Sequence, residues 1–269
     1  MKTLEVGGYT AAYSDSGQGR GVVLAHCSSA SHRMWAPTID DLESRYRVLA
    51  PDLLGYGQST PWPAGRPLDT ALDAEILVRL ARTAGGPVHL VGHSYGGAAA
   101  LEAARQLGSG VLSLTLIEPV AFHLLPQAGR NAEWDEISAL ADAVRVAVSR
   151  GSLRRAAATF MSYWIGRMRW WLMPRRQKAR VVPTMTKVTA EFEGMRRIQI
   201  PLDEYRRVKI PTLLIVGGRT RRPTRAVVDI LGNLLPSVRQ HVLPTAGHMS
   251  PFTHRDEIRQ LIVENVDAE

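Results

Sequence analysis

The chain of 269 residues has a single cysteine, Cys27, and no long apolar run. One cysteine excludes an intramolecular disulfide and a zinc site built from several cysteines, and it fits a reducing compartment. No stretch of about 18 apolar residues occurs, so we expect no membrane-spanning helix, and the start MKTLEVGGYT lacks the apolar core of a secretory signal. We therefore expect a cytoplasmic protein whose stability comes from its core, and 45% of its residues are hydrophobic.

Acidic residues are missing from two segments. None lies between Asp142 and Glu191, and none lies in the loop GGRTRR at 217–222. The formal net charge of +8 comes mainly from the first of these segments. Its basic residues are Arg145, Arg150, Arg154, Arg155, Arg167, Arg169, Arg175, Arg176, Lys178, Arg180 and Lys187.

Short apolar runs bounded by turn residues alternate with helical patterns. The runs at 21–26, 46–52, 87–93, 111–118, 211–218 and 239–248 are mostly apolar on both faces, as buried parallel strands are. Helical periodicity lies between them, for example at Leu68, Leu72, Ile76, Leu77 and Leu80. This order predicts an α/β protein with a doubly wound, mostly parallel sheet. The N-terminal KTLEVGGYTAAYS predicts two strands joined at Gly7 and Gly8, forming an antiparallel edge.

The alternation stops between 120 and 209, where only helical patterns occur. We predict a helical cap at 120–209, inserted into a core domain made of 1–119 and 210–269. Two apolar faces are expected in the cap. One consists of Ile137, Leu140, Val144 and Val148, and the other of Leu153, Ala157, Phe160, Met161, Trp164, Ile165 and Met168.

The stretch LVGHSYGGAAA places Ser94 in a G-x-S-x-G pattern between an apolar run and a helix of small residues. This strand, turn and helix context is that of a nucleophile elbow, which exposes a serine hydroxyl at the end of a sheet. Gly92 and Gly96 remove side chains that would collide in so tight a turn. We predict Ser94 as a catalytic nucleophile.

Four segments in order resemble the α/β-hydrolase family over nearly the whole chain. LAHCSSASHRMW resembles its oxyanion loop, APDLLGYGQS its Asp-x-x-Gly-x-Gly-x-Ser turn, GHSYGG its elbow and PTAGHMSPFTHRDEI its late histidine segment. The resemblance implies the α/β-hydrolase fold, with a cap after the sixth strand, and is weakly specific for the substrate. Dehalogenases and epoxide hydrolases of this fold carry an Asp where Ser94 stands. We expect no cofactor, because no metal-ligand spacing or phosphate-binding glycine loop occurs.

The resemblance implies His248 as the general base, since it lies in a short loop after the last strand and follows the acid in the chain. The family most often has an acidic Asp where this sequence has Thr220. Glu118, at the end of the preceding strand, occupies the alternative acid position, and we predict that it orients His248. In the competing interpretation Glu118 orders the start of the cap or pairs with an arginine, and a Ser-His pair catalyses alone.

The resemblance also implies two oxyanion donors, the backbone N–H groups of Tyr95 and Cys27. Cys27 stands where the family commonly has glycine, and its expected role is geometric. The alternative is a catalytic thiol. His26 and His93 flank these residues without an evident proton-transfer role, and His89 is expected in the core.

The basic cap has two interpretations. Its arginines can form solvated helix faces with their apolar stems on the protein. Alternatively, the cap attracts an acidic substrate or an acyl carrier protein, as in some esterases of the family. Nucleic acid is not expected, because Trp164, Trp170 and Trp171 have a helical spacing typical of a cap core or acyl pocket.

Together these features predict a serine hydrolase, a carboxylesterase that cleaves a small ester through an acyl-enzyme. A lactone, a thioester or acyl-carrier ester, or a carbon-carbon bond would be cleaved by the same residues, and a lyase could also use them. The alternative of another class is a receptor in which the pocket binds a ligand without turnover.

Overall fold

The computed structural model describes residues 1–268, which form a sheet in the order β1-β2-β4-β3-β5-β6-β7-β8. β1 pairs with β2 and β2 with β4 in antiparallel fashion, whereas the remaining pairs are parallel. The antiparallel edge predicted at the N-terminus is therefore present. The strands are β1 (Lys2–Val6), β2 (Tyr9–Ser16), β3 (Gly21–Ala25), β4 (Arg47–Pro51), β5 (Val88–His93), β6 (Val111–Ile117), β7 (Thr212–Gly217) and β8 (Val238–Leu243).

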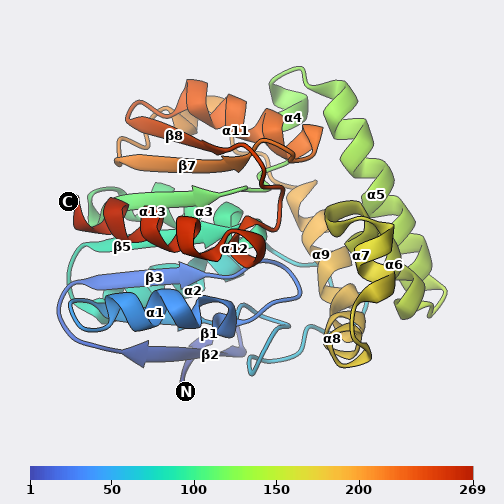
Figure 1. Cartoon of the computed structure of the whole chain (residues 1–269), viewed down its shortest axis with the longest axis horizontal. Coiled ribbons are helices and arrows are strands. Elements are labelled where there is room, and N and C mark those ends of the chain that lie inside the picture. The colour runs from blue at the N-terminus through green and yellow to red at the C-terminus, as the bar shows by residue number, and fades with distance from the viewer. Residues whose placement is uncertain (269) are drawn as a thin grey trace.

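Helices cover both faces of this sheet (Figure 1). α1 (Ala36–Leu42) and α13 (Arg255–Asp267) pack on one face, where Leu42 and Ile262 join a core cluster with the strands. α2 (Ala71–Ala84), α3 (Tyr95–Leu107) and α11 (Arg222–Leu234) contribute to the larger cluster on the other face. Because helices lie on both sides, β3, β5 and β7 are buried throughout, which explains their mostly apolar sequences.

The last predicted strand differs from the others. β8 ends at Leu243, and its residues from 239 to 242 are exposed because β8 is the edge of the sheet. The rest of the run at 239–248 is a loop that carries His248. This loop leaves the sheet at the end where the other parallel strands also finish.

The chain between β6 and β7 is helical, and we call residues 120–209 the cap. Figure 1 shows its long helices beside the carboxyl ends of the parallel strands. Its division from the core as a separate domain stays a prediction. The helices are α4 (Leu124–Gln127), α5 (Asn131–Ser149), α6 (Leu153–Ile165), α7 (Arg167–Leu172), α8 (Arg175–Val181), α9 (Met185–Met195) and α10 (Leu202–Tyr205), with a 3-10 turn at Val182–Thr184.

Two predictions about cap residues were wrong. The second apolar face was extended to Met168, but Gly166, at φ 86°, ends α6, and Met168 is 68% exposed on α7. Trp171 does not belong to a cap core, since it is 73% exposed. Lys187, a basic residue of the acid-free segment for which no position was predicted, is turned inward by α9 and is 1% exposed.

No helix in residues 1–268 is long and apolar enough to cross a membrane.

Candidate active site

Ser94 lies on the sharp turn between β5 and α3, with a backbone φ of 56°. A side chain at Gly92 would collide with the backbone of Gly96, and one at Gly96 would collide with the carbonyl group of His26. The two glycines therefore permit a turn that holds a serine in a conformation L-residues rarely adopt. This is the geometry expected of the G-x-S-x-G segment.

Ser94, His248 and Glu118 form one continuous chain of hydrogen bonds. The Nε2 atom of His248 lies 2.9 Å from Ser94 Oγ, and its Nδ1 atom lies 3.1 Å from Glu118 Oε2. All three residues are buried. Because an ionised carboxylate only accepts, His248 donates from Nδ1 and its Nε2 is left to accept the Ser94 proton. Residues that are distant in sequence thus meet at the carboxyl end of the sheet.

Glu118 is held by the loop that has no acidic residue. The backbone N–H of Gly217 donates to Glu118 Oε1 at 2.6 Å, and the Thr220 hydroxyl donates to Oε2. Glu118 itself has a φ of 49° at the end of β6. Thr220, which stands where the resemblance to the family implies an Asp, therefore acts as a partner of the carboxylate and not as a substitute for it.

The amides of Cys27 and Tyr95 lie at the start of a turn and at the first position of α3. Within residues 1–268 neither N–H donates to another backbone carbonyl, so both are available to a ligand. Burial raises the pKa of the Cys27 thiol to about 12. The thiol is therefore protonated near neutral pH, which argues against the alternative of a thiolate nucleophile.

The cap covers Ser94. A cavity of about 20 Å³ remains beside it, enough for roughly one water molecule. The indole of Trp164 from α6 stacks on the His248 ring with centroids 3.9 Å apart. A substrate therefore needs a movement of the cap to reach Ser94. The cavity is lined by Ser28, Ser94, Val120, Phe122, Phe160, Trp164, Val188, Glu191, Phe192 and Met195.

Two buried histidines form hydrogen bonds to backbone groups of the site. Burial lowers the pKa of His93 to about 3, so its ring is neutral, and Nε2 donates to the carbonyl oxygen of His248 at 2.9 Å. His26 donates from Nδ1 to the Cys27 carbonyl at 2.7 Å and accepts from the Leu53 N–H at 2.9 Å. Both histidines therefore bond to backbone groups. The sequence did not predict these hydrogen bonds, and the only signal for them was the position of the two histidines beside Ser94 and Cys27.

Glu191 and Ser28 were also missed as residues of this cavity. Ser28 Oγ donates to Glu191 Oε2 at 2.6 Å, although 163 positions separate them. The acid-free segment ends at Glu191, and nothing in its local pattern distinguishes it from a surface residue of an amphipathic helix. His89 is buried as expected, with Nδ1 2.8 Å from Ser113 Oγ.

Known proteins support the same fold. The chain is 28% identical over 265 residues to a pimeloyl-[acyl-carrier protein] methyl ester esterase of Methylococcus capsulatus, covering 93% of this chain and 95% of the relative. The enol-lactonase of Burkholderia xenovorans superposes with a TM-score of 0.78 at 18% identity, covering 99% of this chain and all of the other. A thermophilic esterase of Thermogutta terrifontis gives 0.76 at 24% identity, covering 98% and 97%.

The alpha/beta hydrolase family matches residues 22–261, nearly the whole described chain. This agrees with the mostly parallel sheet, the elbow after β5 and the helices inserted after β6. The chain belongs to the alpha/beta hydrolase family and is a hydrolase.

Proposed function

We propose that the protein is a serine hydrolase that cleaves a carboxylic ester through an acyl-enzyme. The observation that carries this proposal is the hydrogen-bonded chain from Ser94 through His248 to Glu118. Ser94 Oγ attacks the ester carbonyl while His248 Nε2 accepts its proton, and Glu118 stabilises the resulting imidazolium. The carbonyl oxygen becomes an oxyanion and accepts hydrogen bonds from the N–H groups of Cys27 and Tyr95.

Collapse of this intermediate releases the alcohol, which takes its proton from His248. Water then attacks the acyl-enzyme, giving a proton to His248 Nε2, and the second intermediate releases the acid and restores Ser94. Glu118 is held in place throughout by its two donors, Gly217 N–H and the Thr220 hydroxyl. A Ser-His pair without an acid is the less favoured alternative, because Glu118 bonds directly to His248.

The size and lining of the cavity beside Ser94 favour a substrate with a small acyl group. Apart from Ser28, Ser94 and Glu191 its walls are apolar or aromatic, with Val120, Phe160 and Val188 among them. Because only about 20 Å³ is free, a long acyl chain would require a larger displacement of the cap than a short one. We therefore propose a short-chain ester, with lactones, thioesters and carbon-carbon bonds as alternatives on the same residues.

The test compares kcat/KM on p-nitrophenyl acetate for the wild type, Ser94→Ala and Glu118→Gln. Ser94→Ala is expected to abolish turnover above background, and Glu118→Gln to lower it by about 10⁴-fold, as for an acid replaced by its amide. A Glu118→Gln variant within tenfold of the wild type would show that a Ser-His pair suffices. A wild type that neither turns over esters nor reacts with a fluorophosphonate would favour the receptor alternative.

The basic cap supports an acyl-carrier ester as a second candidate substrate. Residues 143–190 hold no acid, and cap arginines such as Arg154, Arg155 and Arg175 are exposed. A relative over almost the whole length carries the name of an acyl-carrier ester esterase. Salt should then reduce kcat/KM steeply for an acyl-carrier ester and little for p-nitrophenyl acetate. Equal salt responses would contradict this candidate.

A further inference from the structure

We propose that the cap positions the oxyanion turn, residues 27–30, through Thr184 and Glu191, so that the Cys27 N–H is in place only when the cap is closed. This inference rests on the proposed function, because it concerns an oxyanion formed on Ser94. In this proposal Thr184, Lys187 and Glu191 are positioning residues for the Cys27 N–H, which none of them touches directly.

The oxyanion turn has a strained corner. The Ala30 N–H donates to the Cys27 carbonyl at 3.2 Å, which closes a turn with Ser28 and Ser29 at its two central positions. Ser29 has a φ of 61°, in a region where turns usually place glycine. Within residues 1–268 the non-glycine residues with positive φ are Ser29, Ser94 and Glu118. Such strain persists only where surrounding contacts enforce it, so Ser29 needs an external restraint.

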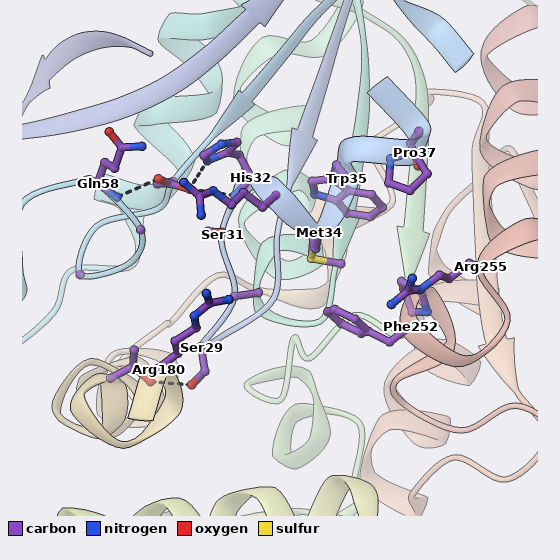
Figure 2. Close-up of a pocket in the computed structure, with 18 of the residues that line it drawn as sticks. Ser29, Ser31, His32, Met34, Trp35, Pro37, Gln58, Arg180, Phe252 and Arg255 are labelled. Atoms are coloured by element: carbon purple, nitrogen blue, oxygen red, sulfur yellow. Dashed lines mark hydrogen bonds and ion pairs between the residues drawn. The ribbon is translucent and has the colours of Figure 1, made fainter. Parts of the chain in front are cut away.

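The first restraint comes from Thr184, just before α9. The Thr184 hydroxyl donates to the Val181 carbonyl at 2.7 Å, so its oxygen is free to accept from Ser29 Oγ at 2.6 Å. Figure 2 shows Ser29 close to Arg180 of α8, on the wall of a cavity of about 670 Å³. The strained corner is thus tied to the cap.

The second restraint comes from α9 itself. Glu191 accepts from Ser28 Oγ at 2.6 Å with one oxygen and from Tyr56 Oη at 2.6 Å with the other. Lys187, one turn earlier on α9, lies 3.4 Å from this carboxylate. The two neighbouring residues at the centre of the turn, Ser28 and Ser29, are therefore both bonded to the cap.

Lys187 connects this arrangement to the second oxyanion donor. Its Nζ lies 2.6 Å from Asp73 Oδ2, and the same oxygen accepts from the Tyr95 hydroxyl at 2.7 Å. The backbone N–H of Tyr95 is the other proposed donor. One buried network, which we call the Lys187 network, therefore joins Asp73, Tyr95, Glu191 and Ser28, and through them both sides of the oxyanion site.

Stability alone does not account for this network. A buried ion pair costs much desolvation, and apolar residues of similar size often stabilise a fold equally well. What the Lys187 network provides is a defined position for α9 against the oxyanion turn. Because a substrate needs a cap movement to enter, displacement of α9 would stretch the bonds to Ser28 and Ser29. Closure would restore them after binding.

The experiment compares two Thr-to-Val substitutions at or near α9. Both hydroxyls donate to a carbonyl of their own segment. Thr184 also bonds to Ser29, whereas within residues 1–268 the Thr189 hydroxyl bonds to Met185 alone. On p-nitrophenyl acetate we expect Thr184→Val to lower kcat by about tenfold with KM within twofold, a fraction of the loss of a whole oxyanion donor. Its Ki for butaneboronic acid should rise by a similar factor. Thr189→Val should leave all three constants within twofold.

A rescue separates positioning from general damage. Glycine adopts φ near 61° without strain, so adding Ser29→Gly to Thr184→Val should restore most of kcat. Failure of this rescue, or a kcat of Thr184→Val within twofold of the wild type, would overturn the inference. If the wild type hydrolyses the ester and Thr184→Val behaves like Thr189→Val, only this inference fails. A wild type without turnover overturns the proposed function, and the inference with it.

Discussion

At the residue scale, the acid of the proposed triad depends on a hydroxyl. Thr220 donates to Glu118 Oε2, the same oxygen that faces His248 Nδ1. The donor fixes the carboxylate without adding charge to a loop that already holds Arg219, Arg221 and Arg222. An aspartate aligned at this position would instead place a second carboxylate close to Glu118.

Thr220→Val should therefore lower kcat/KM by about tenfold, since a hydrogen bond to a charged group contributes about 1.5–3 kcal/mol. The measurement is p-nitrophenyl acetate turnover beside Thr245→Val, whose exposed hydroxyl contacts His254 alone among the described side chains. Equal kinetics for the two variants would contradict a role of Thr220 in holding Glu118.

Cys27 gives a second prediction at this scale. Its proposed contribution is the backbone N–H, and burial keeps its thiol protonated, so Cys27→Ala should keep kcat/KM within about fivefold of the wild type. A loss of kcat/KM of more than a hundredfold would instead indicate catalysis by the thiol, even if a fluorophosphonate still labels Ser94.

At the element scale, α9 makes contacts with the core and with the cavity beside Ser94 that its sequence did not indicate. It buries Lys187 between Asp73 and Glu191 and lines the cavity with Val188, Phe192 and Met195. A helix read by its apolar spacing would place the lysine at the surface. The partner that explains its burial, Asp73, lies on α2 in the other part of the chain.

Lys187→Met should destabilise the fold by about 3–5 kcal/mol, because it leaves two buried carboxylates without their cation. Urea unfolding at neutral pH measures this, and Lys209→Met, at an exposed position, should change the free energy of unfolding by less than about 0.5 kcal/mol. A similar small change at both positions would mean that the Lys187 network is hydrated and weak.

At the whole-molecule scale, buried histidines make the fold sensitive to acid. Burial lowers the pKa of each of four side chains below the usual 6.5, to about 4 for His89 and His123, to about 3 for His93, and downward for His26. The unfolded chain therefore binds more protons than the folded one below pH 6.5. Stability is fully present above that pH and falls as the pH drops towards 4.

Each such histidine contributes a slope of up to about 1.4 kcal/mol per pH unit in this window. Burial raises the pKa of Glu191, which acts in the opposite direction, because a raised carboxyl pKa lets the folded state bind a proton more readily than the unfolded chain does. Urea unfolding between pH 7 and 4.5 should show a falling free energy, and His93→Gln should reduce the slope by about one proton. An unchanged slope in His93→Gln would contradict the burial of a neutral imidazole there.

Local sequence determined the fold and indicated the proposed nucleophile. Parallel strands buried on both faces are mostly apolar, so β3, β5 and β7 could be predicted from their apolar runs, and the elbow at Ser94 depends on glycines two residues away. The resemblance to the family indicated His248 as the proposed base, by its place in the loop after the last strand. Met168 was misplaced because periodicity continues across Gly166 although the helix does not.

Contacts between distant segments were decided only by the tertiary structure. Thr220 and Glu118 are 102 positions apart, and Ser28 and Glu191 are 163 apart. No spacing rule links such residues, because their meeting depends on how the strand order brings β6 beside β7 and how the cap lies on the core. Hence the sequence by itself determined which class of reaction the chain is suited to. The tertiary packing, including that of the cap, decided which side chains position the proposed site residues.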